Sequence, residues 1–199
     1  MKQWIEVMNK HVKNGLWDIT YLQLCDWLAL DGPEIPMNKF RVAGGTESTF
    51  TCSAFYYHSL TLTYKVAKIL GKEDDYQLYK KRAEETLKAI RHEYFTPSGR
   101  CAVQTQTALS LAIVLDLCPE GEMKTSVDNL HKLLEDKDFH LRTGFIGTPI
   151  LCRALTKGGN NQDAVTTFLQ KDYPGWLYPV TMGATSMWER WDSMRPDGK

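Results

Sequence analysis

Hydrophobic positions along the chain alternate between two helical patterns. Between Thr49 and Leu70, apolar residues recur at helical spacing in two neighbouring rows, so the predicted helix is apolar over much of its circumference. Gly71 then offers a helix C-cap. From Tyr76 to Tyr94 the apolar residues fall on one stripe, and charged residues occupy the other side. The sequence therefore predicts a buried helix followed by an exposed one.

The same alternation occurs twice more along the chain. Residues 104–117 are apolar nearly all round, whereas residues 122–135 keep their apolar side chains on one side. Residues 149–156 and 161–169 form a third, shorter pair, and residues 1–12 are expected to form an exposed helix before the first pair. Such alternation suits an inner helical layer shielded by an outer one. We therefore predict an all-α fold of about three helical hairpins.

The links between the predicted helices differ in length. Links from a buried to an exposed helix are short and rich in Gly or Pro, whereas links in the other direction are long. In two concentric layers the long links all emerge at one rim, where they surround a single mouth. Long loops on a rigid scaffold commonly carry binding and catalytic residues. Five of the six tryptophans lie in the first and last long links, residues 13–48 and the segment from 172 onward.

Composition and charge exclude several classes of function. Lys+Arg and Asp+Glu both number 24, so nucleic acid is not an expected partner. The first residues lack the apolar core of a signal peptide and no apolar run could span a bilayer, so we expect a soluble chain, of undetermined compartment, with no membrane partner. The five cysteines include no Cys-x-x-Cys pair and the histidines no i, i+4 pair, so we expect neither a metal site nor a cofactor.

Two clusters in the long links combine tryptophan with acidic residues. They are Asp26-Trp27 and Trp188-Glu189-Arg190-Trp191-Asp192. Sugar rings present apolar C–H faces and rims of hydroxyl groups, so flat aromatic surfaces beside carboxylates suit them chemically. Glycoside hydrolysis ordinarily uses two carboxyl groups, and Glu189 is the best candidate for one of them.

Each cluster also has a purely structural interpretation. Loop tryptophans can close the ends of helical layers. Glu189 can form an ion pair with Arg190 or another basic residue, and Asp26 can cap a turn before Asp31. Asp192 could orient a partner, cap the next helix or bind a sugar hydroxyl. The residues alone leave these alternatives open.

Several motifs, in this order, carry a resemblance to a known family. They are Asp26-Trp27-Leu28-Ala29, Leu70-Gly71, Gln106-Thr107-Ala108-Leu109, Thr143-Gly144-Phe145-Ile146-Gly147-Thr148, Trp176-Leu177-Tyr178-Pro179-Val180, and the segment from Gly183 to Ser193. Over nearly its whole length the chain resembles the C-terminal half of the catalytic domain of α-L-rhamnosidases, glycoside hydrolase family 78. The resemblance implies a partial (α/α)6 barrel, with residues 1–199 as a fragment of one catalytic domain.

The resemblance also implies a reaction and roles for particular residues. Members of this family release terminal α-L-rhamnose with inversion, using one glutamate as general acid and another as general base. Glu189 is the implied general base, and Asp26 and Trp27 are implied contacts in the rhamnose pocket. Trp188 and Trp191 are implied to contact the substrate as well. The implied partner is a rhamnose-containing glycoside or oligosaccharide.

The chain departs from the family pattern in two small ways and one large way. Cys25 stands where the family usually has glycine, and Ser186 where it usually has threonine. The acid motif of the family lies upstream of Met1, and the chain stops before the closing helix of the barrel. We therefore expect the 199 residues alone to be inactive, and to associate with the missing barrel half or with one another.

Two other functions remain open at this point. One is an α/α-barrel glycosidase acting on a different sugar, which a panel of aryl glycosides would identify. The other is a non-catalytic, carbohydrate-binding helical-repeat module whose tryptophan loops serve as a platform. Binding of rhamnose without turnover would indicate the second.

Overall fold

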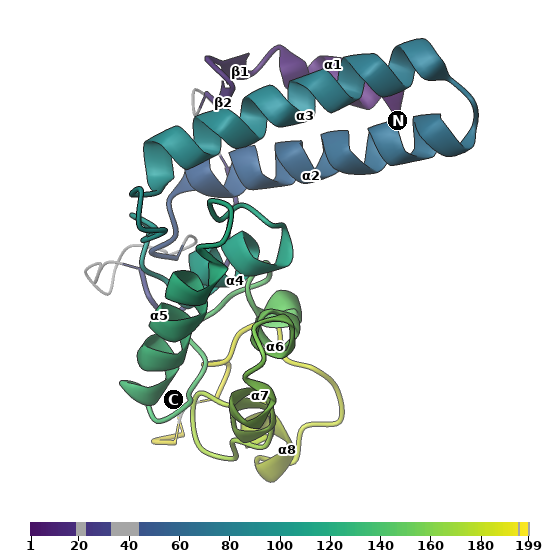
Figure 1. Ribbon diagram of the computed structural model, residues 1–199. Helices are drawn as coiled ribbons and strands as arrows, with labels where there is room; N and C mark the ends of the chain where they lie inside the picture. The colour runs from purple at the N-terminus through teal and green to yellow at the C-terminus, as the bar shows by residue number, and fades with distance from the viewer. Residues whose placement is uncertain (19–22, 33–43, 195, 199) are drawn as a thin grey trace.

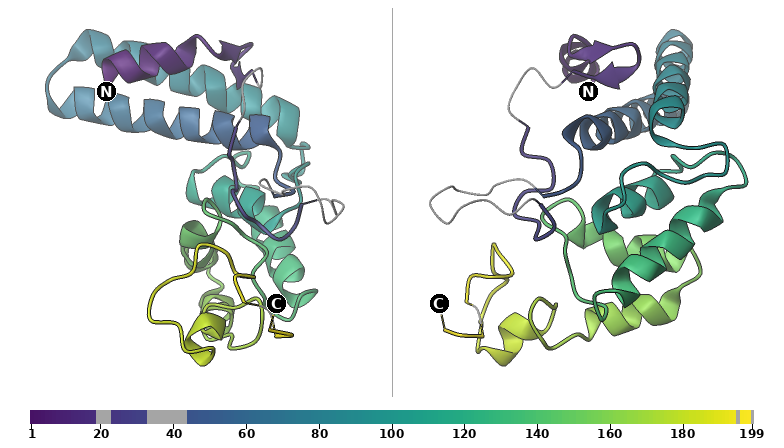
Figure 2. Two further views of the ribbon diagram at one scale, coloured as in Figure 1. Left: turned by 180° about the vertical axis from the view of Figure 1, so that it is seen from behind. Right: turned by 90° about the vertical axis from the view of Figure 1, so that its left-hand side faces the viewer.

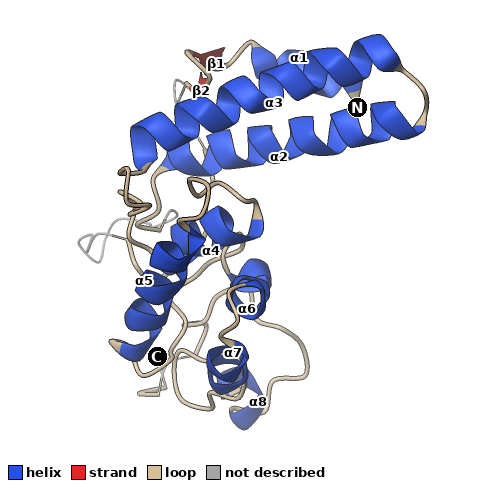
Figure 3. Ribbon diagram, viewed as in Figure 1, coloured by secondary structure: helices blue, strands red, loops and turns tan. Residues whose placement is uncertain are grey.

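The computed structural model describes residues 1–18, 23–32, 44–194 and 196–198. Within these residues the chain is mostly helical, with one two-stranded antiparallel sheet (Figures 1 and 3). None of the described helices is both long and apolar enough to cross a membrane. The elements are α1 (Lys2–Asn9), β1 (Val12–Lys13), β2 (Leu16–Trp17), α2 (Ser48–Ile69), α3 (Glu73–Tyr94), α4 (Gln106–Val114), α5 (Met123–Glu135), α6 (Thr148–Lys157), α7 (Asn161–Phe168) and α8 (Tyr178–Thr181).

Three helical hairpins follow one another along the chain, α2–α3, α4–α5 and α6–α7. The long α2–α3 hairpin forms the upper arm in Figure 1, and the other two hairpins lie below it. α4 packs against both α2 and α6, so these three helices form an inner layer, and α3, α5 and α7 each cover the preceding inner helix. The predicted all-α, partial α/α-barrel fold is confirmed.

α4 is the most enclosed helix, as its composition predicts. Every residue of Gln106–Ile113 is buried. Its partner α5 buries one stripe, which includes Leu130 and Leu134. Phe50 of α2 and Leu151 of α6 belong to the same hydrophobic cluster as the α4 side chains. The first and last hairpins are therefore joined through α4.

α2 is less enclosed than its apolar composition predicts. Phe50 near its start and Tyr56 in its middle are buried. Towards its end, Leu62 is 45%, Val66 38% and Ile69 83% exposed. The described residues therefore leave part of the far half of α2 uncovered and apolar.

The expectation of one helix over residues 1–12 is wrong for its last three residues. α1 ends at Asn9, and β1 and β2 form a hairpin. The turn residues Asn14 and Gly15 have φ angles of 52° and 81°, as a two-residue Asn-Gly hairpin turn requires. A Cβ atom on Gly15 would lie 2.7 Å from the Cβ of Ala89 in α3, so the turn packs closely on that helix. The helical pattern of the preceding residues obscured this Asn-Gly signal.

Candidate functional site

Asp26 lies where three loops meet, before α2, α4 and α6. Its side chain is fully buried. Oδ1 accepts hydrogen bonds from the backbone N–H groups of Ile146 (2.9 Å) and Gly147 (3.0 Å). Oδ2 accepts from the N–H of Gly144 (3.1 Å) and from the hydroxyl of Thr107. The carboxylate is therefore satisfied by donors of the chain itself. These donors belong to α4 and to the loop before α6, which lie below the α2–α3 hairpin in both views of Figure 2.

Two glycines allow the loop before α6 to approach the Asp26 segment. A Cβ atom at Gly144 would collide with the carbonyl oxygen of Trp27, and one at Gly147 would collide with the hydroxyl of Thr107. The N–H of Phe145 also donates to the carbonyl oxygen of Trp27 at 3.0 Å. The two segments thus lie backbone against backbone, in a space that admits no larger residue at either glycine.

The placement of Asp26 differs from the expected sugar contact. Both carboxylate oxygens are occupied in a fully buried position, so Asp26 holds the loop before α6 against its own segment. It does not serve as the side-chain cap of the turn before Asp31 either. Trp27 is half-buried beside this junction and is not among the residues that line the cavity next to it.

A cavity of about 170 Å³ lies between the loop before α6 and the C-terminal segment. Its walls are largely aromatic, and the ring-bearing residues are Phe145, Trp176, Trp188 and Trp191. Glu189 supplies the one carboxylate among the described residues that line it. An aromatic cavity with a single acidic group has the chemistry of a site for one sugar ring.

Glu189 is exposed, and it forms no hydrogen bond or ion pair with any residue in the described part of the chain. The neighbouring Arg190 instead pairs with Asp192, through contacts of 2.9 Å from Nε to Oδ1 and 3.1 Å from Nη2 to Oδ2. This two-pronged geometry is the strong form of the arginine–carboxylate pair. Arg190 is therefore paired with Asp192, and Glu189 is left available to a ligand.

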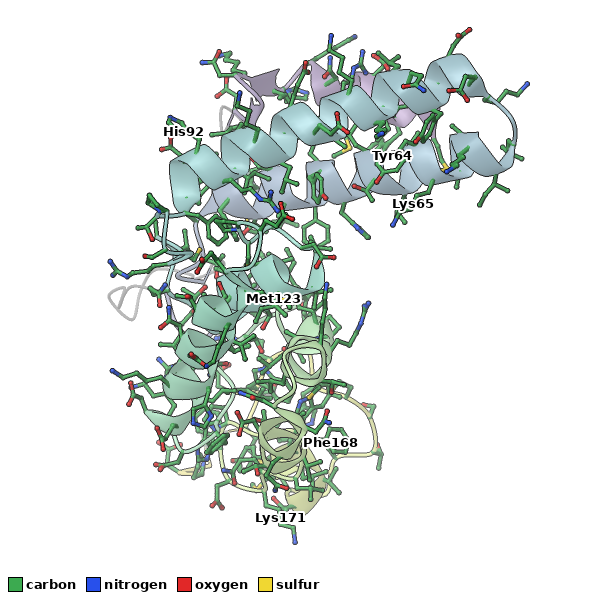
Figure 4. The ribbon with its side chains drawn as sticks, in the orientation of Figure 1. Tyr64, Lys65, His92, Met123, Phe168 and Lys171 are labelled. Carbon is green, nitrogen blue, oxygen red and sulfur yellow. The ribbon has the colours of Figure 1, made fainter. Side chains whose placement is uncertain are left out.

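Trp191 is an anchor as well as part of the cavity wall. It is 7% exposed, and its Nε1 donates to the carbonyl oxygen of Thr143 at 3.0 Å. Its ring lies 5.5 Å from the ring of Trp176 at an interplanar angle of 73°. Trp176 in turn lies 5.8 Å from the ring of Phe168, which Figure 4 places at the end of α7. The C-terminal segment is therefore fastened to the body of the hairpins by a row of rings.

Trp188 is more open than Trp191. It is half-buried and makes an edge contact with the ring of Tyr178, with the ring centres 6.1 Å apart. The structure thus brings Trp188, Glu189 and Trp191 together at one cavity and places Asp26 behind the cavity wall. Among the described residues, no group of three or more His, Cys, Asp or Glu side chains is arranged to hold a metal ion.

Sequence reasoning missed the cavity residues Phe145 and Trp176. Both lie in motifs that carry the family resemblance, yet neither was singled out as a site residue. The glycines that flank Phe145 were an available signal, because paired glycines often mark a place where backbones come close. They could not show which segment approaches, since Trp27 is far away along the chain.

A loop-bearing rim of helical hairpins, with a carboxylate beside aromatic rings, places the chain in the class of α/α-barrel glycosidase domains. The chain belongs to the bacterial α-L-rhamnosidase six-hairpin glycosidase domain family, whose model matches residues 1–199.

Known relatives are much longer than this chain. An α-L-rhamnosidase of Alteromonas sp. is 35% identical over 195 residues, which are 97% of this chain and 21% of the relative. One from Streptomyces avermitilis is 38% identical over 157 residues, 79% of this chain and 15% of the relative. The chain thus spans about a fifth or less of the length of these relatives.

Solved structures resemble the chain closely. The crystal structure of Streptomyces avermitilis α-L-rhamnosidase complexed with L-rhamnose matches with a TM-score of 0.87 and 33% identity, covering 99% of this chain and 18% of that one. Native α-L-rhamnosidase from Aspergillus terreus matches with a TM-score of 0.85 and 30% identity, covering 94% and 21% respectively.

Proposed function

We propose that this chain contributes the general-base side of the active site of an inverting α-L-rhamnosidase. The observation that carries the proposal is the exposed Glu189 carboxylate at a cavity that Trp188 and Trp191 line. The named relatives, which are α-L-rhamnosidases, support it. The proposed substrate is a glycoside or oligosaccharide that carries terminal α-L-rhamnose.

Glu189 acts as a base towards water. Its ionised carboxylate accepts a proton from a water molecule while the water oxygen attacks the anomeric carbon. A second carboxyl group protonates the departing glycosidic oxygen from the opposite face, so the anomeric configuration inverts. In inverting enzymes the two carboxyl groups lie roughly 6.5–9.5 Å apart. Because Glu189 is the one carboxylate among the described cavity residues, the acid belongs to another part of the enzyme.

The aromatic residues hold the sugar ring. Trp188 offers a partly open indole surface for the apolar C–H face of rhamnose. Trp191 forms a fixed wall, and Trp27 is a further proposed contact. Asp26 acts indirectly, as a positioning residue that holds Phe145 at the cavity through the loop before α6.

The 199 residues by themselves are proposed to be inactive, because one carboxylate cannot both activate water and protonate the leaving group. The partly exposed apolar side chains of Leu62, Val66 and Ile69 are proposed to pack on further helices of the barrel. In the isolated chain, a second copy of the same chain is proposed to cover these side chains in place of the further helices. Light scattering should then give a mass above that of the monomer, and a monomer at all concentrations would contradict this proposal.

The general-base role is tested in the enzyme that carries this domain. Glu189→Gln is expected to lower kcat on an aryl α-L-rhamnoside by roughly 10²- to 10⁴-fold, with little change in KM. The matched control is Glu135→Gln, at an exposed glutamate at the end of α5, and it should leave kcat unchanged. Added azide should restore cleavage by Glu189→Ala and form a rhamnosyl azide of inverted configuration.

The first sugar product, followed by NMR, should be the β anomer. An α anomer as first product, or full activity of Glu189→Gln, would overturn the proposed role. Rhamnose binding without turnover by the unaltered enzyme would favour a carbohydrate-binding module. Cleavage of other aryl glycosides in place of rhamnosides would favour a different sugar. Turnover by the isolated chain that Glu189→Gln abolishes would refute its proposed inactivity.

A further inference from the structure

Two cysteines meet beside the Asp26 junction although they are distant in the sequence. Cys25 immediately precedes Asp26, and Cys52 lies in the first turns of α2. Their sulfur atoms are 3.9 Å apart, and both side chains are half-buried. Both also line a second cavity, of about 400 Å³, which is distinct from the one at Glu189. Small molecules of moderate polarity can therefore approach the two sulfur atoms together.

The backbone holds this pair in place from both sides. Cys25 has a φ of 44°, a left-handed conformation that residues other than glycine adopt rarely. Its carbonyl oxygen accepts from the N–H of Trp27 at 2.9 Å, and the next residue, Asp26, is fixed by its four donors. Cys52 is fixed because it lies in α2 between the buried residues Thr51 and Ser53. The proximity of the thiols thus follows from two anchored segments.

The two thiols differ in their ease of ionisation. The contact with the Cys52 side chain lowers the pKa of Cys25 to about 7, against the opposing effect of burial. The same interaction, together with burial, raises the pKa of Cys52. The thiolate is the reactive form of cysteine, so Cys25 is suited to attack an oxidant first. Cys52 is suited to react afterwards with the oxidised sulfur of Cys25.

We propose that Cys25 and Cys52 form an oxidation site, at which a small hydroperoxide converts the two thiols into an intramolecular disulfide. The Cys25 thiolate attacks the terminal oxygen of the hydroperoxide, the O–O bond breaks, and the leaving alkoxide takes a proton. Cys25 is then a sulfenic acid. The Cys52 sulfur attacks the Cys25 sulfur, the S–O bond breaks, and water leaves with the thiol proton. Two thiols and one hydroperoxide thus give one disulfide, one alcohol and one water.

Formation of the bond requires only a short movement of the two sulfur atoms. A disulfide has an S–S distance of about 2.05 Å, so the sulfur atoms must approach by about 2 Å from their present contact. The new bond would tie the segment that carries Asp26 directly to α2. The other three cysteines make no sulfur–sulfur contact of this kind in the described structure, and burial raises the pKa of Cys101 to about 11. The reaction is therefore specific to one pair.

The test uses the purified protein, reduced and then exposed to one equivalent of tert-butyl hydroperoxide. Free thiols are blocked with iodoacetamide, and the digested protein is analysed by mass spectrometry. We expect one cross-linked peptide pair joining Cys25 to Cys52, lighter by two hydrogen atoms and released by dithiothreitol. Cys101, Cys118 and Cys152 should be recovered in the alkylated form, or unmodified where burial protects them.

Two variants separate the roles of the sulfur atoms. Cys52→Ser should abolish the cross-link and leave a sulfenic acid on Cys25 that dimedone traps. Cys25→Gly should abolish both products, and it tolerates the left-handed backbone, so loss of the cross-link there does not reflect misfolding. The matched control is Cys152→Ser, another half-buried cysteine, and it should retain the cross-link.

Three outcomes would overturn the proposal. The first is alkylation of both Cys25 and Cys52 after treatment with hydroperoxide. The second is a sulfenic or sulfinic acid on Cys25 in the unaltered protein without a cross-link. The third is a disulfide that joins either residue to a different cysteine or to a second chain. None of these results depends on the proposed glycosidase activity.

Discussion

Asp26 and Glu189 are both carboxylates beside tryptophan in long loops, yet their surroundings differ in every respect. Asp26 is fully buried and receives hydrogen bonds from three backbone N–H groups and one hydroxyl. Glu189 is exposed at a cavity and has no partner in the described part of the chain. The difference teaches that an acidic residue next to an aromatic one does not by itself mark a sugar contact. The supply of internal donors decides whether the carboxylate serves the fold or a ligand.

The sharpest test of this difference is Asp26→Ala. The substitution leaves the N–H groups of Gly144, Ile146 and Gly147 buried without an acceptor, so we expect a loss of roughly 3 kcal/mol or more in the free energy of unfolding. Urea denaturation followed by circular dichroism measures it. An unchanged midpoint would mean that the junction contributes nothing to stability, and Asp26 would then be open to a ligand role.

A smaller loss is expected for Thr107→Val. This change keeps the side-chain volume and removes the hydroxyl that donates to Asp26, while the three backbone donors remain. A hydrogen bond to a charged group contributes roughly 1.5–3 kcal/mol, so the unfolding free energy should fall by about that amount. In the background of Asp26→Ala the same substitution should cost much less. Equal losses in both backgrounds would show that the two side chains are not coupled.

Substitutions of Trp188 and Trp191, which lie on either side of Glu189 in the sequence, should differ in their effect on stability. Trp191→Phe removes the indole N–H that donates to the carbonyl oxygen of Thr143, and we expect a loss of about 1–2 kcal/mol in stability. Trp188→Phe should change stability by less than about 0.5 kcal/mol, because Trp188 is partly open and keeps its apolar contact as phenylalanine. Thermal unfolding of the two variants side by side provides the measurement. Equal effects would contradict the assignment of Trp191 as the anchor.

The smallest effect on stability is expected for Glu189→Gln. An exposed side chain without a partner contributes little, so the unfolding free energy should stay within about 0.5 kcal/mol of its original value. A fall of more than about 1 kcal/mol would show that Glu189 is engaged with the rest of the fold. It would then resemble Asp26, and the comparison would no longer hold.

Helical periodicity predicted the hairpins well because the residues that form the buried face of one helix lie only three or four positions apart in the sequence. The contrast between α4 and α5 is visible in the sequence and is realised in the structure. The β-hairpin after α1 was missed because its two strands have only two residues each, too few to show the alternation that predicts a strand beside the helical pattern of the preceding residues. The exposure of the far half of α2 was also missed. An apolar composition predicts that a helix is buried, but it does not show whether other residues of the chain lie against that helix.

The site was predictable only in part, for a similar reason. The place of Glu189 in a long loop beside tryptophan followed from the lengths of the links, whereas its proposed role as general base is implied by the family resemblance. The pairing of Arg190 with Asp192 depends on how one turn directs its side chains, which no spacing rule supplies. The role of Asp26 was beyond reach, because its hydrogen-bond donors lie between 81 and 121 positions away along the chain.

The same separation has a consequence for how the protein is made. During synthesis Asp26 leaves the ribosome long before Gly144 and Gly147, so its carboxylate stays hydrated while α2 to α5 are being completed. The junction can close only when the loop before α6 has emerged. A nascent chain halted ahead of that loop should therefore be digested readily by protease around Asp26, and one halted well beyond α6 should resist.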